Sequence, residues 1–352
     1  MESKEISPAT HETFDWSQRR VLVTGGASFI GSHLVELLLA KGVRRLRVVD
    51  DLSTGLRENL EPYLSEGRVE LRVEDLLRDG AAREAMRDID VVFHLAAIHG
   101  GRGYIDRHQS ECAQNLALDG LVTRAAVSAG VDKFVFASSG CVYPVELQGD
   151  VHRELYLREE MVGPGFHADG LYGWAKLMAE LTLEACYREQ GLKSCSCRLF
   201  TAYGERGLES HALVAMISRA FLRLDPFEVW GDGTQIRNWT YVTDIVRGLV
   251  LAAERIDDAT AINLGTEESI TVLEAARAVL SLTGHEAKII LRTDMPTGPL
   301  NRVASNELAR RLLGWTPEVS FSEGLRRTAR WYFDTKRREQ VEREFYNKLI
   351  ER

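Results

Sequence analysis

The sequence has no apolar run of the ~18 residues that a membrane-spanning helix requires. Its first residues, MESKEISPATHETFDWSQRR, also lack the continuous apolar segment of a secretory signal. Of the 352 residues, 45% are apolar and 27% are charged, which is typical of soluble globular proteins. These features predict a cytoplasmic protein without a membrane partner.

Cysteine is scarce as well, and the 44 basic residues are outnumbered by 52 acidic ones. The five cysteines (Cys112, Cys141, Cys186, Cys195 and Cys197) are odd in number and scattered, which does not fit a disulfide framework. Cys195 and Cys197 supply only two of the four ligands of a zinc site, so we expect them in a strand and predict no metal. The net charge of −8 excludes the basic surface that a nucleic-acid partner requires. Any anionic ligand must therefore be held by local arginines.

Short β-branched runs alternate with helical patterns from Arg20 onward. The runs are continuously apolar, which predicts strands buried on both faces. Spacers such as Ser32–Lys41 and Leu116–Ala129 carry apolar residues at helical intervals. The pattern predicts an α/β fold with a Rossmann-type, doubly wound parallel sheet. The expected strands are Val21–Val23, Leu46–Val49, Val69–Val73, Val91–Leu95 and Phe134–Ala137.

The stretch VLVTGGASFIGSHL joins the first strand to a helix through a glycine-rich turn. Gly25 and Gly31 occupy the outer positions of a G-x-x-G-x-x-G loop, and Ser28 replaces the middle glycine. Free backbone N–H groups and the helix dipole at such a turn bind a pyrophosphate. The hydroxymethyl group of Ser28 narrows the loop without closing it, and its hydroxyl can donate to a phosphate oxygen. The loop therefore predicts a bound dinucleotide.

The next two strand ends refine the choice of dinucleotide. Asp50 ends the second strand, 25 residues after Gly25, where a carboxylate accepts hydrogen bonds from both ribose hydroxyls. The same carboxylate would repel a 2′-phosphate, so NAD is predicted rather than NADP. Asp75 and Leu76 follow the third strand, where the adenine ring is expected.

The stretch LYGWAKLMAE places Tyr172 and Lys176 at positions i and i+4, on one face of a helix. A tyrosine is a poor base at its ordinary pKa near ~10. We expect the lysine cation one turn away to stabilise the phenolate and to lower that pKa. Ser139, at the end of the strand FVFASS, is expected to hydrogen-bond a substrate oxygen beside the tyrosine.

With these motifs in order, the chain resembles the extended short-chain dehydrogenase/reductase family, in particular its nucleotide-sugar epimerases. The resemblance covers about Arg20 to Phe333. It also rests on FHLAA (Phe93–Ala97), RLFTAYG (Arg198–Gly204), WGDGTQIRNWTYVTDI (Trp230–Ile245), NLGTEESITVLE (Asn263–Glu274) and ARRLLGWTPEVSFSEGLRRT (Ala309–Thr328). The resemblance implies a tightly held NAD, a homodimer, and Tyr172 as the base that starts C4 oxidation of the sugar. It also implies phosphate contacts from Arg237 and Arg302, with Arg219 as a weaker candidate.

Within that family the chain is most similar to the GDP-mannose 3,5-epimerases. HGGRGYI (His99–Ile105) resembles their glycine-rich sugar loop, and Cys141 falls on their catalytic cysteine. Two positions differ. His211 replaces the lysine that acts as the partner acid, and Thr201 replaces an asparagine common in the family.

The implied chemistry leaves two outcomes open after C4 oxidation. A rotated 4-ketone can take its hydride back on the other face, which inverts C4. Alternatively, Cys141 and His211 can exchange the acidified protons of C3 or C5 from opposite faces. Because the partner acid is replaced, we expect C4 inversion of a GDP- or UDP-sugar, with C3/C5 inversion as the alternative. A 4,6-dehydratase would carry a carboxylate pair where Gly140 and Cys141 stand, and a non-catalytic NAD-binding module would not need Ser139, Tyr172 and Lys176.

The same reasoning assigns roles along the whole chain. We predict a flexible leader (1–18), a NAD-binding Rossmann domain (19–190, with 227–260 returning to it), a nucleotide-sugar-binding lobe (191–226 and 261–335) and a charged helical tail (336–352). The predicted catalytic residues are Ser139, Cys141, Tyr172, Lys176 and His211. The predicted NAD-binding residues are Gly25, Ser28, Phe29, Ile30, Gly31, Asp50, Asp51, Ser53, Asp75, Leu76, Leu95, Ala96, Ala97, Tyr172 and Lys176. The predicted substrate-binding residues are Gly101, Arg102, Thr201, His211, Arg219, Gln235, Arg237 and Arg302.

Overall fold

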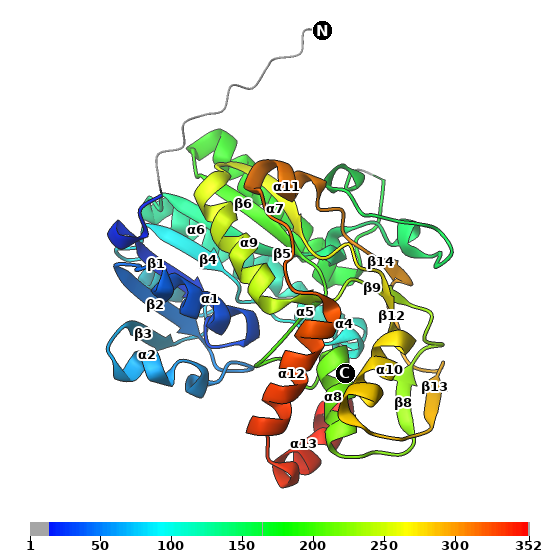
Figure 1. The fold of residues 1–352 in the computed structure, drawn as a ribbon. Coiled ribbons are helices and arrows are strands. Elements are labelled where there is room, and N and C mark those ends of the chain that lie inside the picture. Colours follow the sequence, from blue (N-terminus) through cyan, green and yellow to red (C-terminus); the bar gives the residue numbers. More distant parts are fainter. Residues whose placement is uncertain (1–13, 164, 351–352) are drawn as a thin grey trace.

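The computed structural model describes residues 14–163 and 165–350 of the chain. Its largest sheet has seven strands: β1 (Arg20–Thr24), β2 (Arg45–Asp50), β3 (Val69–Val73), β4 (Val91–His94), β5 (Lys133–Ser139), β6 (Ser194–Leu199) and β11 (Asp258–Leu264). Their order is β11-β6-β5-β4-β1-β2-β3, and every neighbouring pair is parallel (Figure 1). The predicted doubly wound parallel sheet is confirmed, and each of the five predicted strands overlaps one of β1 to β5.

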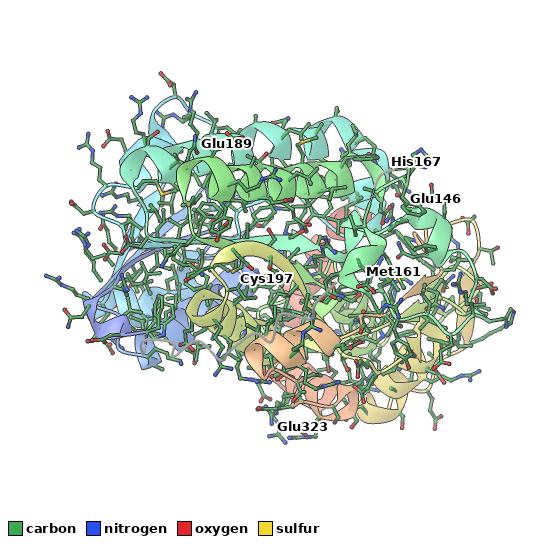
Figure 2. The ribbon with its side chains drawn as sticks, turned by 90° about the horizontal axis from the view of Figure 1, so that it is seen from above. Glu146, Met161, His167, Glu189, Cys197 and Glu323 are labelled. Atoms are coloured by element: carbon green, nitrogen blue, oxygen red, sulfur yellow. The ribbon has the colours of Figure 1, made fainter. Side chains whose placement is uncertain are left out.

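Helices cover both faces of this sheet because its strands are apolar on both sides. In β1, Val21 and Val23 belong to one buried cluster, whereas Leu22 between them belongs to another. The first cluster includes side chains of α1 (Phe29–Ala40), α9 (Val242–Arg255) and α11 (Glu307–Leu313). The second includes side chains of α3 (Ala81–Ala85), α6 (Asn115–Ala129) and α7 (Gly170–Gln190). Figure 2 shows the sheet from above, between the two helical layers, with Cys197 in the middle layer.

The strand order reverses at β1, which pairs with β2 on one side and with β4 on the other. In a doubly wound sheet, the carboxyl ends of the two strands at such a reversal open a crevice that binds ligands. The glycine-rich loop follows β1, and FHLAA continues past β4, so both reach this crevice.

Beyond the sheet lies a second lobe of helices and three small sheets. Its buried core is rich in aromatic side chains, among them Tyr203, Trp239 and Tyr332. The helices are α8 (Ala212–Phe221), α10 (Val272–Thr283), α12 (Phe321–Thr335) and α13 (Arg338–Ile350). The strand pairs are β7 (Ala202–Tyr203) with β10 (Thr240–Tyr241), β8 (Phe227–Trp230) with β13 (Ile289–Arg292), and β9 (Ile236–Arg237) with β12 (Ile270–Thr271) and β14 (Asn301–Arg302). Short helices α2 (Glu61–Ser65), α4 (Arg102–Arg107) and α5 (Gln109–Ala113) complete the fold.

Five strands lie on the other side of the predicted boundaries. The prediction places β6 in the lobe with 191–226 and divides β11 at residue 261, yet both belong to the seven-stranded sheet. It also assigns β8, β9 and β10 to the segment returning to the Rossmann domain. In the structure these strands pair within the second lobe, β8 with β13, β9 with β12 and β14, and β10 with β7. Short apolar runs look alike in a sequence, and tertiary packing decides which neighbour each strand pairs with.

The two ends of the chain are more firmly packed than the sequence predicts. Residues 1–13 of the predicted leader lie outside the described residues, but Trp16 is only 4% exposed and donates from Nε1 to Glu254 Oε1 at 2.7 Å. The predicted helical tail contains α13. It is not simply solvated, because Val341 and Phe345, one turn apart, are buried in the second lobe. Over the ranges that the structure describes, no helix is both long and apolar enough to span a bilayer.

Candidate active site

One cavity of about 360 Å³ runs from the glycine-rich loop to the arginines of the second lobe. It brings together all five predicted catalytic residues. The predicted residues that line it are Gly25, Ser28, Phe29, Ile30, Gly31, Leu95, Ala97, Gly101, Arg102, Ser139, Cys141, Tyr172, Lys176, Thr201, His211, Gln235, Arg237 and Arg302. Six predicted NAD-binding residues lie outside this lining, at or just beyond the ends of β2, β3 and β4: Asp50, Asp51, Ser53, Asp75, Leu76 and Ala96. Their contacts with the cofactor stay predictions.

The backbone of the loop explains why two of its three glycine positions are fixed and one is not. Gly25 has a φ of +68°, and a Cβ there would come within 2.9 Å of Ala96 N. A Cβ at Gly31 would come within 2.1 Å of Gly25 O. Ser28, in contrast, has a φ of −83°, which any residue adopts. Serine is therefore tolerated by the fold itself at the middle position.

The hydroxyl of Ser28 lies near the end of β2. Its Oγ is 3.5 Å from Asp50 Oδ2 and 3.4 Å from Thr54 Oγ1. The carboxylate of Asp50 also accepts from Ala27 N and Leu52 N, each at 2.9 Å. Burial raises the pKa of Asp50, although these hydrogen bonds act in the opposite direction. Asp50 thus fixes the loop, and Oδ1, which accepts from Leu52 N, keeps a further lone pair for a ribose hydroxyl.

Tyr172 lies in the first turn of α7, where Gly173 lets the helix approach the loop after β5. A Cβ at Gly173 would come within 2.2 Å of Cys141 O. Burial raises the pKa of Tyr172, and a hydrogen bond with Ser139 opposes that shift. The expected lowering by Lys176 does not dominate, because Nζ lies 5.9 Å from the centre of the tyrosine ring. In this site, desolvation has the larger effect on the phenol.

Lys176 has an unsatisfied ammonium group. It is 1% exposed, Nζ has no hydrogen-bond partner, and the nearest carboxylate oxygen, Asp119 Oδ2, is 3.8 Å away. Burial lowers the pKa of Lys176, while Asp119 acts to raise it. A buried donor without a partner is costly. The hydroxyls of a nicotinamide ribose would satisfy it, so the residues present fit NAD at this position.

A buried hydrogen-bonded chain behind Lys176 is not anticipated from the sequence. Thr24 Oγ1 lies 2.7 Å from His94 Nδ1, and His94 Nε2 lies 3.0 Å from Asp119 Oδ1. Burial lowers the pKa of His94, and Asp119 opposes this shift. Thr24 Oγ1 also accepts from the backbone N–H groups of Leu95 and Ala96, each at 3.1 Å. The motif FHLAA marks this chain in the sequence, but its partners Thr24 and Asp119 are distant along the chain.

Two histidines stand side by side at the middle of the cavity. The rings of His99 and His211 are stacked, with centroids 6.1 Å apart and planes at 15°, and the His99 ring lies 6.3 Å from that of Tyr172. Desolvation and the charge of Lys176 lower the pKa of His99 to about 4, so its imidazole is neutral at pH 7. His211 precedes α8 without capping it through its side chain. The sequence predicts His211 as a site residue but not His99.

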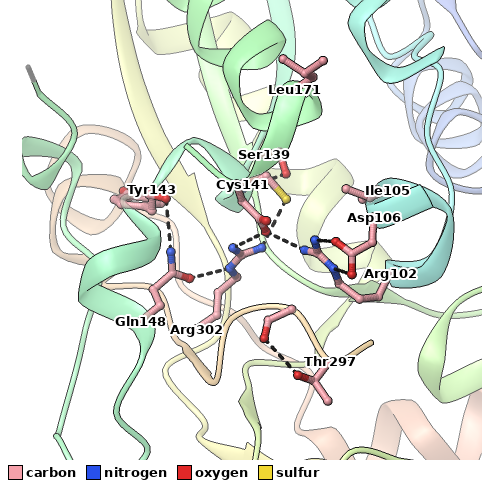
Figure 3. A network of polar contacts seen from close by, with 12 residues as sticks. Arg102, Ile105, Asp106, Ser139, Cys141, Tyr143, Gln148, Leu171, Thr297 and Arg302 are labelled. Atoms are coloured by element: carbon pink, nitrogen blue, oxygen red, sulfur yellow. Dashed lines mark hydrogen bonds and ion pairs between the residues drawn. The ribbon is translucent and has the colours of Figure 1, made fainter. Parts of the chain in front are cut away.

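At the sugar end, Cys141 faces two arginines (Figure 3). Arg302 Nη1 donates to Cys141 Sγ at 3.2 Å, and Arg302 Nη2 donates to Asp169 Oδ2 at 2.8 Å. Arg102 Nη1 donates to the same oxygen of Asp169 at 2.7 Å. Asp169 is not predicted as a site residue, because nothing in its local sequence marks it.

Arg237 and Arg219 have different surroundings. Arg237 donates to Ile236 O and Thr297 O, each at 2.8 Å, and lines the cavity. Desolvation together with the neighbouring guanidinium groups lowers its pKa to about 9, which leaves a cation suited to an anionic ligand. Arg219 does not line the cavity: it donates to Ala215 O and lies over the Phe345 ring. Its predicted role in substrate binding is therefore not supported by its position.

Two polar atoms at the lobe end of the cavity have no hydrogen-bond partner. These are Gln235 Oε1 and Trp239 Nε1, one acceptor and one donor. Buried polar groups are normally satisfied. This end of the cavity therefore fits a ligand with both donor and acceptor groups.

Comparison with known proteins agrees with this geometry. Residues 21–265 match the model of the NAD dependent epimerase/dehydratase family. The chain is 30% identical to GDP-mannose 3,5-epimerase 1 of Oryza sativa subsp. indica over 331 residues, 92% of this chain and 83% of that protein. It is 29% identical to UDP-glucuronic acid decarboxylase 6 of Arabidopsis thaliana, over 91% of this chain and 90% of that protein.

A solved structure of a nucleotide-sugar epimerase has a similar fold. The UDP-glucose 4-epimerase of Thermus thermophilus, in complex with NAD, superposes with a TM-score of 0.79 at 28% identity, over 90% of this chain and all of the other. The fold, the family match over most of the chain and the clustering of Ser139, Tyr172 and Lys176 agree with one another. The chain belongs to the NAD-dependent epimerase/dehydratase family, the extended short-chain dehydrogenase/reductase group that its motifs resemble.

Proposed function

We propose that this protein is a nucleotide-sugar epimerase that works through a transient 4-keto sugar. One observation carries the proposal: Tyr172 and Ser139 line the same cavity as the phosphate loop and Arg237. A sugar whose diphosphate contacts Arg237 would reach back toward the tyrosine, and the cofactor would approach from the other side. This arrangement suits reversible oxidation of a sugar hydroxyl.

The chain's own groups have separate tasks in this step. NAD, when bound, supplies the acceptor and later the donor of the hydride. Tyr172 Oη takes the proton of the C4 hydroxyl and returns it at the end, while the Ser139 hydroxyl orients the same oxygen. Lys176 holds the ribose beside the tyrosine with its otherwise unpaired Nζ.

The fate of the ketone separates two candidate reactions. The sequence favours C4 inversion of a GDP- or UDP-sugar, which needs only rotation of the ketopyranose. Two contacts support proton exchange at C3 or C5 instead. Cys141 lines the cavity with Arg302 Nη1 on its sulfur, and His211 lines the same cavity. We therefore place C3/C5 inversion first and C4 inversion second.

Incubation with GDP- and UDP-sugars in D₂O, followed by NMR, tests the choice. Proton exchange would leave solvent deuterium at C3 or C5 of the product, and Cys141→Ser would lose it because serine lacks an accessible thiolate. The matched control is Cys186→Ser, on the half-buried cysteine of α7, which should behave like the parent protein. Inverted product without deuterium would establish C4 inversion. Net production of NADH would contradict both epimerase reactions.

The homodimer is also part of this proposal. Leu171, Trp174, Met178 and Leu181 are 39–50% exposed and lie three or four residues apart on α7, so they form one apolar stripe. The neighbouring helix α6 also carries an exposed apolar side chain, Leu116. Two copies could bury these stripes against each other around a twofold axis. Met178→Glu should shift the mass measured by analytical ultracentrifugation from dimer to monomer. A parent protein that sediments as a monomer would contradict the proposal. The cytoplasmic location stays a prediction.

A further inference from the structure

Asp169 lies at a junction of the active site. It directly precedes α7, whose first turn carries Tyr172, and its backbone N–H donates to Cys141 O at 2.8 Å. Its side chain is almost entirely buried. The backbone of Asp169 therefore connects the segment that holds the tyrosine to the segment that holds the cysteine.

One carboxylate oxygen of Asp169 serves two cations. Oδ2 accepts from Arg302 on β14 at 2.8 Å and from Arg102 on α4 at 2.7 Å. The other groups of Arg302 are also engaged, since Nε donates to Gln148 Oε1 at 2.7 Å and Nη1 to Cys141 Sγ. Figure 3 shows Arg102 and Arg302 pointing toward each other below Cys141. Asp169 and Gln148 together fix the guanidinium plane so that one edge meets the sulfur.

The charges in this group are unequal. Burial raises the pKa of Asp169, but Arg302 and Arg102 outweigh burial and hold that pKa below its usual value. An ionised Asp169 is shared by Arg302 and Arg102, Arg102 also pairs with Asp106, and Arg237 is a third guanidinium group nearby. Three guanidinium groups therefore face two carboxylates, so positive charge remains beside the sulfur. The other titratable groups that interact with Cys141 are Tyr172 on α7, Cys112 on α5 and Arg237 on β9.

We propose that Asp169 is a positioning residue for proton transfer at Cys141. It holds Arg302 against the sulfur, and by sharing its charge with Arg102 it sets how much positive charge the sulfur meets. This inference rests on the proposed function. The Cys141 thiolate would take a proton from the carbon beside the ketone, and the C–H electron pair would pass into the enolate. Protonated His211 would return a proton to that carbon, while Asp169 and Arg302 keep their protonation states.

The pH dependence of Cys141 alkylation tests the network without turnover. The NAD-bound protein is treated with iodoacetamide across a pH range, and modification is measured on the Cys141 peptide by mass spectrometry. The pH at which alkylation is half-maximal is called the alkylation midpoint. Asp169→Asn removes the negative charge, so this midpoint should fall by about one pH unit. Arg102→Met leaves the whole charge of Asp169 to Arg302, so the midpoint should rise. The control is Asp106→Asn, which also removes a carboxylate from Arg102 but at a partly exposed position, and its shift should be much smaller.

The opposite signs make the test decisive. An unchanged midpoint in both variants, or a shift of both in the same direction, would overturn the proposal. If Asp169→Asn does not fold, Arg102→Met alone decides it, because an unchanged or lowered midpoint contradicts the shared carboxylate.

A kinetic measurement separates positioning from a purely structural role. In Asp169→Asn, solvent exchange at C3 or C5 should fall about tenfold, a modest part of a general-base effect. NAD content and the initial oxidation at C4 should stay near parental values. Loss of NAD with an unshifted alkylation profile would assign Asp169 to the fold only. If the parent protein shows no solvent exchange, the proposed C3/C5 reaction fails, whereas the alkylation shifts still test the network itself.

Discussion

The two ends of the cavity are assembled in different ways. At the cofactor end, Gly25 and Ser28 lie in the loop between β1 and α1, and Gly31 lies in the first turn of α1. At the sugar end, Asp169 meets Arg102 from 67 residues away and Arg302 from 133 residues away. The loop is defined by local backbone requirements, whereas the arginine group exists only after the second lobe has packed against the sheet. A local motif can therefore reveal the first end but not the second.

The largest loss of turnover is expected for a variant of Tyr172, which lines the cavity between its cofactor end and its sugar end. Tyr172→Phe removes the proton acceptor and keeps the ring, so turnover should fall by at least ~10²-fold. Because burial raises the pKa of Tyr172, parental activity should rise with pH as the phenol ionises, and the variant should lack this rise. Steady-state rates across pH, with nucleotide-sugar affinity from calorimetry, check both statements. Near-parental turnover in the variant would mean that another group starts the reaction.

A second test compares Arg237 with Arg219, which the sequence ranks as the weaker candidate for substrate binding. Arg237→Leu removes a charged donor from the cavity, which is worth roughly 1.5–3 kcal/mol, so affinity for the nucleotide sugar should fall by about 10- to 100-fold. Arg219→Leu, on α8, should bind substrate normally. Calorimetric titration of each variant measures the difference. Equal losses of affinity would place Arg219 in the binding site after all.

The serine of the loop gives a smaller effect at the cofactor end. Ser28→Gly should keep NAD, because the backbone there does not require either residue. Ser28→Leu would block approach of the pyrophosphate, and NAD content should fall about tenfold, or ~1.4 kcal/mol. Release of NAD after denaturation, with absorbance or chromatography as the readout, gives the occupancy. Full occupancy in the leucine variant would contradict the position assigned to the pyrophosphate.

The smallest change in turnover is expected for a variant of His99, the partner of His211 in the stacked pair. His99→Phe keeps an aromatic ring against His211 and removes a group that is neutral at pH 7, so turnover should change by no more than about fivefold. His211→Phe, the matched variant, should lose solvent exchange if His211 donates the proton. Deuterium incorporation, measured in both variants, shows which of the two histidines donates the proton. A larger loss in His99→Phe would make His99 the proton donor.

The sequence predicts most of the cofactor half for a physical reason. Continuous apolar runs, a glycine loop and the i, i+4 spacing of Tyr172 and Lys176 are local patterns, and each has few structural solutions. Cys141, Arg102 and Arg302 are predicted as single residues, but their shared partner Asp169 is not. The pKa of Tyr172 could not be predicted either, because it depends on burial by residues from distant segments. Similarly, β8 and β11 pair with strands that no local pattern specifies.

The path of the chain limits how such a protein can change. After β6 the backbone leaves the large sheet for α8 and β8, returns as α9 and β11, and leaves again for α10 and β13. It then packs α11 against the sheet layer before it ends in α12 and α13. No single cut separates the two parts, so the second lobe cannot be exchanged as a block between relatives. New sugar preferences would have to arise by substitution inside the cavity or by changes in individual loops, with the whole chain folding as one unit.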